Sequence, residues 1–129
     1  MSTKRNISII GGAGHIGFPL GLILSSKGFK VSLIDKNKNN IKKINNGEVP
    51  FLEENSKKLL TDMRKKKRIY ATDQINEISK SKYIIICIST PITNQLNPNL
   101  KPFINFFHQL KKKIKKDQII IIRSSIYPG

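Results

Sequence analysis

The chain is poor in cysteine, and that scarcity limits its chemistry. Its 129 residues hold one cysteine, two histidines and no tryptophan. One cysteine allows no disulfide within the chain, and the sequence shows no His/Cys cluster with metal-ligand spacing. Cys87 lies in the apolar run 84–88, where a small buried core residue is the ordinary role. We therefore expect neither a disulfide framework nor a metal centre.

Acidic residues are also scarce: 8 stand against 24 basic ones, and the net charge is +16. Such a charge attracts phosphates, nucleic acid or anionic lipid. The densest basic runs, 64–68 and 111–116, fall where we expect helices to end, and cations there complement the helix dipole. Aromatic residues set among the basic ones, as on a nucleic-acid platform, are missing. Most of the lysines are therefore interpreted as solvated surface.

Long apolar stretches are absent. No segment reaches the roughly 18 consecutive apolar residues of a membrane-spanning helix. The first apolar stretch is interrupted at once by glycines, unlike the core of a signal peptide. A soluble cytoplasmic protein is the expectation, and the length suits one domain with a real core.

What the chain does have is a regular alternation of β-branched runs and amphipathic segments. We expect strands at 6–10, 30–34, 68–71, 83–88 and 118–122, and helices at 16–26, 38–45, 53–66, around Ile75 and Ile78, and at 101–116. Asn37 is the expected cap of the second helix, and Pro19 should distort the first slightly. This alternation predicts an α/β fold: a doubly wound, Rossmann-like parallel sheet of about five strands, order 3-2-1-4-5.

The sheet ends early by this prediction, since the full doubly wound arrangement has about six strands. The apolar run 119–122 would then lie at a sheet edge, which is an association hazard. We therefore expect residues 1–129 to be one domain from a longer protein, truncated after the fifth strand, that associates or is marginally stable alone.

The stretch "IIGGAGHIGFPLG" (9–21) follows the first strand and opens the first helix. Gly12, Gly14 and Gly17 spell G-x-G-x-x-G, whereas Gly11, Gly14 and Gly17 spell G-x-x-G-x-x-G. Glycines in such a turn permit the sharp bend, let the backbone approach a pyrophosphate, and let helix and strand pack closely. The phosphates then meet free amides at the positive end of the helix.

A carboxylate stands in the matching place on the second strand. Asp35 ends that strand, 18 residues after Gly17. There it can accept hydrogen bonds from the ribose hydroxyls of a dinucleotide. Because it would also repel a 2′-phosphate, NAD is the favoured cofactor over NADP.

Three further segments favour the G-x-G-x-x-G spelling. They are "NNGEVPFLEENSKKLL" (45–60), "ICISTPITNQLNPNL" (86–100) and "IIIIRSSIYPG" (119–129). With Gly17-Phe18-Pro19, they resemble the UDP-glucose/GDP-mannose dehydrogenase family, and most of all its UDP-N-acetylhexosamine dehydrogenases. The resemblance covers essentially the whole chain in order. It implies the NAD-binding part of an enzyme that oxidises a sugar's primary alcohol to a carboxylate in two hydride transfers, for polysaccharide precursors.

The resemblance also implies roles for particular residues. The cofactor-binding positions are Gly12, Gly14, His15, Ile16 and Gly17 at the pyrophosphate (His15 and Ile16 through their backbone), Asp35 at the ribose, Ser89, Thr90 and Pro91 along the fourth-strand crevice, and Ser125 near the nicotinamide. Glu53 would be structural, and Asn40 stands where the family often has a basic residue. The family's catalytic cysteine and lysine, its central helical segment and its sugar-nucleotide domain come later in the chain. We therefore expect residues 1–129 to bind NAD without turnover, and the full-length enzyme to be a homo-oligomer.

Two alternatives stay open at this point. The G-x-x-G-x-x-G spelling fits a fragment of a short-chain-type nucleotide-sugar epimerase or reductase, whose usual Tyr-x-x-x-Lys pair would lie beyond residue 129. The positive charge fits a non-enzymatic nucleotide- or nucleic-acid-binding module, which steeply salt-dependent DNA binding would support.

Overall fold

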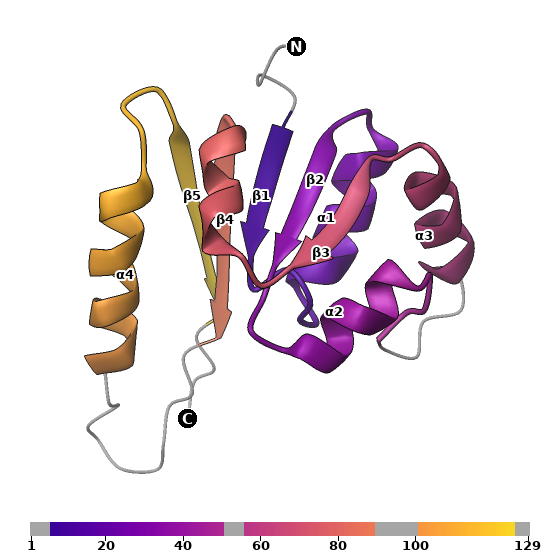
Figure 1. The fold of residues 1–129 in the computed structure, drawn as a ribbon, viewed down its shortest axis with the longest axis horizontal. Helices are drawn as coiled ribbons and strands as arrows, with labels where there is room; N and C mark the ends of the chain where they lie inside the picture. Colours follow the sequence, from indigo (N-terminus) through magenta and orange to yellow (C-terminus); the bar gives the residue numbers. More distant parts are fainter. Residues whose placement is uncertain (1–5, 51–55, 90–100, 126–129) are drawn as a thin grey trace.

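The computed structural model describes residues 6–50, 56–89 and 101–125. Figure 1 shows a parallel sheet flanked by helices. Its elements in chain order are β1 (Asn6–Ile10), α1 (Gly17–Ser26), β2 (Lys30–Ile34), α2 (Lys38–Asn45), α3 (Ser56–Lys65), β3 (Ile69–Thr72), the 3₁₀ helix η2 (Ile75–Lys80), β4 (Tyr83–Ser89), α4 (Lys101–Lys113) and β5 (Ile119–Ser125). The five strands have the order β3-β2-β1-β4-β5, so the predicted fold class is confirmed.

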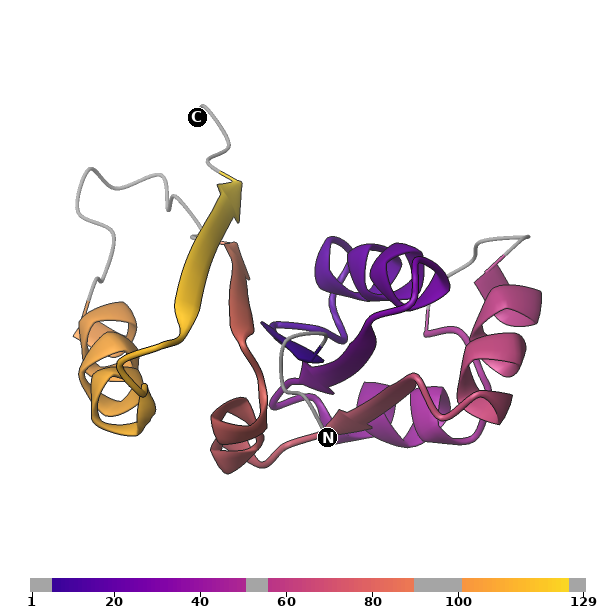
Figure 2. The same cartoon turned by 90° about the horizontal axis from the view of Figure 1, so that it is seen from above.

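The chain reverses direction across the sheet at β1. The first three strands run outward from β1 to β3, and the chain then returns to place β4 against the other side of β1. Right-handed crossovers consequently put helices on opposite faces before and after this point. Figure 2 shows α1 on one side of the sheet and η2 on the other. The strand ends on either side of β1 form the switch point at which such sheets bind ligands.

Two apolar clusters hold the layers together. On the α1 side, Phe18 and Leu22 pack with Leu33 of β2 and Leu60 of α3. On the other side, Ile78 of η2 and Leu110 of α4 pack with the isoleucines of β1, β2 and β4. Burying one such side chain contributes about 1.5–3 kcal/mol. These isoleucine-rich strands are therefore both the sequence signal for the sheet and the main source of its stability.

Helix ends follow local chemistry. The Asn37 side chain accepts a hydrogen bond from the Asn40 amide at 3.1 Å, so the predicted cap of α2 is confirmed. Gly28, with φ of 103°, follows the end of α1 as expected of a helix stop. Basic residues fill the last turns of α3 and α4, where cations face the helix carbonyls.

Several boundaries differ from the prediction. Helix α4 ends at Lys113 rather than 116, β3 begins and ends one residue later, and β5 extends to Ser125. Pro19 is the third residue of α1, and Leu20 still donates to the Ile16 carbonyl at 3.3 Å. Because first-turn amides have no partner within the helix, proline is tolerated there and the helix continues through it.

Candidate cofactor-binding site

The turn after β1 depends on Gly11, which lies outside the G-x-G-x-x-G triplet. Gly11 has φ of +79°, a conformation that side chains disfavour. A Cβ atom here would also collide with the Cys87 carbonyl oxygen on β4. The amide of Gly11 donates to the Ile34 carbonyl at 2.8 Å. Gly11 thus joins the ends of three strands, and its lack of a side chain is required.

The glycines of the G-x-G-x-x-G triplet divide into two kinds. A Cβ on Gly12 would lie 2.8 Å from the Leu33 Cα, and one on Gly17 would collide with the backbone of Gly11 and Gly12. At both positions the packing of α1 and the loop against the sheet leaves no space for a side chain. Among the residues that the structure describes, a Cβ on Gly14 would meet only the Gly11 oxygen, at 3.4 Å. Packing therefore does not explain Gly14, whose open side leaves room for a ligand.

The start of α1 presents amides to this space. Within the described residues, the amides of Ile16 and Gly17 have no protein acceptor. Ile16 is the N-cap residue and Gly17 the first residue of this ten-residue helix, so both amides lie at the positive end of its dipole. An anion placed there gains hydrogen bonds and a favourable field, which is the usual arrangement for a pyrophosphate.

The carboxylate of Asp35 is bound to the loop itself. One oxygen, Oδ2, accepts the Ala13 amide at 3.0 Å, and the other, Oδ1, accepts the Asn37 amide at 3.0 Å. Each carboxylate oxygen can accept a further hydrogen bond, so both remain able to receive ribose hydroxyls. Asp35 therefore has a structural function in addition to the predicted one: it sets the position of the loop.

Asn40 holds the same peptide segment from the other side. Its Nδ2 donates to the Ala13 carbonyl at 3.1 Å, so both the amide and the carbonyl of Ala13 are bound to side chains. In the sequence, the family resemblance marked this position only by the absence of a basic residue. An amide side chain is suited to the place because it donates to a carbonyl without bringing charge beside Asp35.

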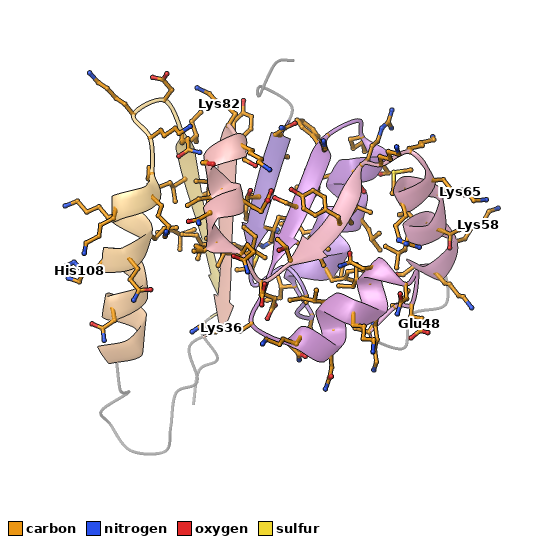
Figure 3. The ribbon with its side chains drawn as sticks, viewed as in Figure 1. Lys36, Glu48, Lys58, Lys65, Lys82 and His108 are labelled. Carbon is orange, nitrogen blue, oxygen red and sulfur yellow. The ribbon has the colours of Figure 1, made fainter. Side chains whose placement is uncertain are left out.

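The carboxyl ends of the remaining strands come to the same edge. Ser89 of β4 and Ser125 of β5 are partners in the strand register. Figure 3 labels Lys36, the neighbour of Asp35, at this edge, and Lys82 at the opposite edge. The predicted positions Thr90, Pro91 and Glu53 lie outside the described residues.

Cys87 has no chemistry of its own here. The residue is partly buried beside the α1-side cluster. Burial raises the pKa of its thiol, and the charge of Arg123 opposes this shift only in part. The described residues contain no group of three His, Cys, Asp or Glu side chains that could hold a metal ion.

A glycine loop at the switch point of a parallel sheet, with a carboxylate on the second strand, defines a dinucleotide-binding Rossmann domain. Residues 5–129 match the UDP-glucose/GDP-mannose dehydrogenase family, NAD binding domain, and the chain belongs to this family. NAD is therefore its cofactor. The family assignment also decides against the short-chain-type alternative.

Similar proteins agree with this assignment. Protein CapL of Staphylococcus aureus is 31% identical over 98% of this chain, which spans 28% of that protein. UDP-N-acetyl-D-mannosamine dehydrogenase of Pyrococcus horikoshii is 28% identical over 92% of the chain and 28% of its own length. The GDP-mannose dehydrogenase structure from Pseudomonas aeruginosa superposes with a TM-score of 0.83 at 26% identity, over 95% of this chain and 29% of that one. The chain thus spans less than a third of the length of each of these three proteins.

The helices in the described part of the chain are all too short or too polar to cross a membrane.

Proposed function

We propose that this chain holds NAD for an enzyme that oxidises the primary alcohol of a UDP-sugar to a carboxylate, as a step toward polysaccharide precursors. The observation that carries the proposal is the Asp35 carboxylate, hydrogen-bonded to the glycine loop at the switch point of the sheet. UDP-N-acetylhexosamines are the favoured substrates, because relatives at about 30% identity are named for them. The enzyme would act in the cytoplasm as a homo-oligomer.

Most of the predicted residues that the structure describes have a place in this proposal. The backbone of the loop, with Gly14 at its open side, cradles the pyrophosphate, and Ile16 and Gly17 donate their amides to it. Asp35 accepts the adenosine ribose hydroxyls. The carboxyl ends of β4 and β5, including Ser89 and Ser125, border the nicotinamide half of the crevice. The groups that transfer protons and form covalent intermediates are proposed to lie outside residues 1–129.

Calorimetric titration with NAD and NADP tests the cofactor site. We expect saturable binding of NAD and binding of NADP weakened by about tenfold or more, since a 2′-phosphate would meet the Asp35 carboxylate at close range. The weaker binding of NADP has an electrostatic cause, so the difference in affinity between NAD and NADP should shrink as salt is added. A preference for NADP, or equal affinity for both, would contradict the assignment of Asp35.

Strand β5 gives a second expected result. Ile119, Ile120, Ile121 and Ile122 are between 39% and 59% exposed, and no further strand pairs with β5 in the described residues. Apolar edge strands promote association. We expect the isolated chain to self-associate in light scattering, and Ile120→Lys with Ile122→Lys to reduce this association. A monodisperse wild-type monomer that melts cooperatively in calorimetry would contradict the expectation.

A further inference from the structure

A hollow lies at the opposite edge of the sheet from the glycine loop. Its volume is about 500 Å³, and it is bordered by the first residues of β1, β2 and β3, by the end of α3, and by η2. None of the residues 11–17, nor Asp35, lines it. It is therefore separate from the cofactor site, by the length of the strands. Ligand pockets of small molecules have volumes of about 300–1,000 Å³, which includes this one.

The floor of the hollow includes Ser32 and Ser81, whose hydroxyl groups are joined through the buried hydroxyl of Ser8, which lies beneath them and does not itself line the hollow. Ser8 Oγ lies 2.8 Å from Ser32 Oγ and 2.7 Å from Ser81 Oγ, and these side chains are 0%, 4% and 5% exposed. The opposite face of the same strands carries Ile7, Ile9 and other apolar residues. Strands of a parallel sheet covered on both faces are normally apolar on both. A polar floor at this end indicates a surface adapted to a polar ligand.

Among the described residues that line the hollow, Glu77 is the only acidic one, and its carboxylate is already paired. Tyr70 Oη donates to Glu77 Oε2 at 2.5 Å, and Lys80 Nζ lies 3.4 Å from Glu77 Oε1. Burial and the hydrogen bond to Glu77 raise the pKa of Tyr70 to about 12, so the phenol stays protonated at neutral pH. The hydrogen bond from Tyr70 lowers the pKa of Glu77. The carboxylate is thus bound by a phenol and an ammonium group, which neutralises most of its repulsion toward an anion.

The rim supplies cations that have no such partner. Lys30, Arg64 and Lys67 line the hollow, and within the described residues none of them forms an ion pair. Lys67 has φ of 56°, just beyond the end of α3, where glycine is usual and a lysine is strained. With Lys80, four cationic side chains face one carboxylate. Like charges gathered around one hollow repel each other unless an anion lies between them.

We propose that this hollow is a second ligand site, for a small molecule that carries a diphosphate or several phosphate groups. The cations of the rim would bind the phosphate oxygens, and the hydroxyl floor would accept or donate hydrogen bonds beneath them. The site is independent of the cofactor loop, so its ligand would bind together with NAD. It offers the domain a means to sense a phosphorylated metabolite.

Inorganic pyrophosphate, added to the ¹⁵N-labelled chain in the presence of saturating NAD, tests the proposal. We expect saturable shifts of the amide signals of Lys67, Tyr70 and Lys80, while those of residues 12–17 stay unchanged because the cofactor loop is occupied. If pyrophosphate shifts only the loop signals, or shifts none in a saturable way, the second site does not exist. When pyrophosphate is added without NAD, it should also shift the amide signals of residues 12–17. If those signals shift even in the presence of NAD, then NAD has not occupied the loop, and this failure is distinguished from a failure of the second site.

A matched pair of double variants separates the site from general charge. Arg64→Ala with Lys67→Gly removes two rim cations, and the glycine suits the left-handed backbone at 67. Lys111→Ala with Lys112→Ala removes the same charge from exposed positions on α4. We expect the first pair to weaken pyrophosphate binding about tenfold or more, and the second less than about threefold.

If both double variants weaken pyrophosphate binding equally, pyrophosphate is attracted only by the net charge of the chain, and the proposal is overturned. The last measurement is the binding of a single-stranded 12-mer DNA to the wild type and to both double variants. If it binds more tightly than pyrophosphate, and both variants weaken it equally, the basic surface serves nucleic acid and the small-molecule site is rejected. Thermal melting of each variant confirms that the fold is intact.

Discussion

Gly17→Ala should destabilise the whole domain, whereas Gly14→Ala should leave the fold intact and weaken NAD binding. At Gly17 the new methyl group would collide with backbone atoms of Gly11 and Gly12, which cannot rotate away as a side chain can. Overpacking costs about 1–3 kcal/mol and occasionally more, and we expect at least the upper value here. A change of this size lowers the melting temperature of a domain of this length by roughly 10 °C or more.

At Gly14 the added methyl group meets one oxygen at 3.4 Å, so stability should stay within about 0.5 kcal/mol of the wild type. NAD affinity should nevertheless fall at least about tenfold, because the methyl group takes the space through which the pyrophosphate approaches. Urea denaturation and calorimetric titration of both variants measure the two effects. A Gly14→Ala chain that binds NAD normally would show that the pyrophosphate lies elsewhere.

Substitutions of Asp35 and Asn40 should separate two effects on NAD binding. Asp35→Ala removes the ribose acceptor and also the partner of the Ala13 amide, and we expect NAD affinity to fall about 100-fold. The preference for NAD over NADP should disappear with the charge. Asn40→Ala removes only the hydrogen bond to the Ala13 carbonyl, so NAD and NADP should both bind several-fold more weakly and their ratio should not change.

Asp35→Asn completes the comparison. It keeps one acceptor oxygen at the carboxylate's place and removes the charge, so it should lose cofactor preference more than affinity. The readout is the ratio of NAD to NADP affinity from calorimetry, measured at one salt concentration. If Asn40→Ala alters that ratio as strongly as Asp35→Asn does, then Asn40 contacts the cofactor directly and does not act through the loop.

The sequence was sufficient for those features that depend on neighbours along the chain. Isoleucine-rich runs predicted the strands, Asn37 predicted a helix cap, and the spacing from Gly17 to Asp35 predicted a carboxylate at the carboxyl edge of β2. These signals are local, or they follow from the period of a strand or helix. The strand order also followed, because alternating elements and short connections leave few topologies.

Features made by distant segments could not be predicted. The need for glycine at position 11 comes from the Cys87 carbonyl, which lies on a strand much later in the chain. The second function of Asp35 depends on where Ala13 lies after folding. The linked hydroxyl groups of Ser8, Ser32 and Ser81 come from three separate segments, and in the sequence each is an ordinary serine. Contacts of this kind have no periodic signal.

The contact between Gly11 and Cys87 places the cofactor loop at the seam between the two halves of the sheet. The turn is therefore bounded by strands on both sides of β1: the Gly11 amide donates to the Ile34 carbonyl of β2, and its backbone lies against the Cys87 carbonyl of β4. By mass action, bound NAD must in turn favour the state in which this seam is closed. Bound NAD would therefore stabilise the folded sheet, and a change that weakens the pairing of β1 with β4 would also weaken NAD binding.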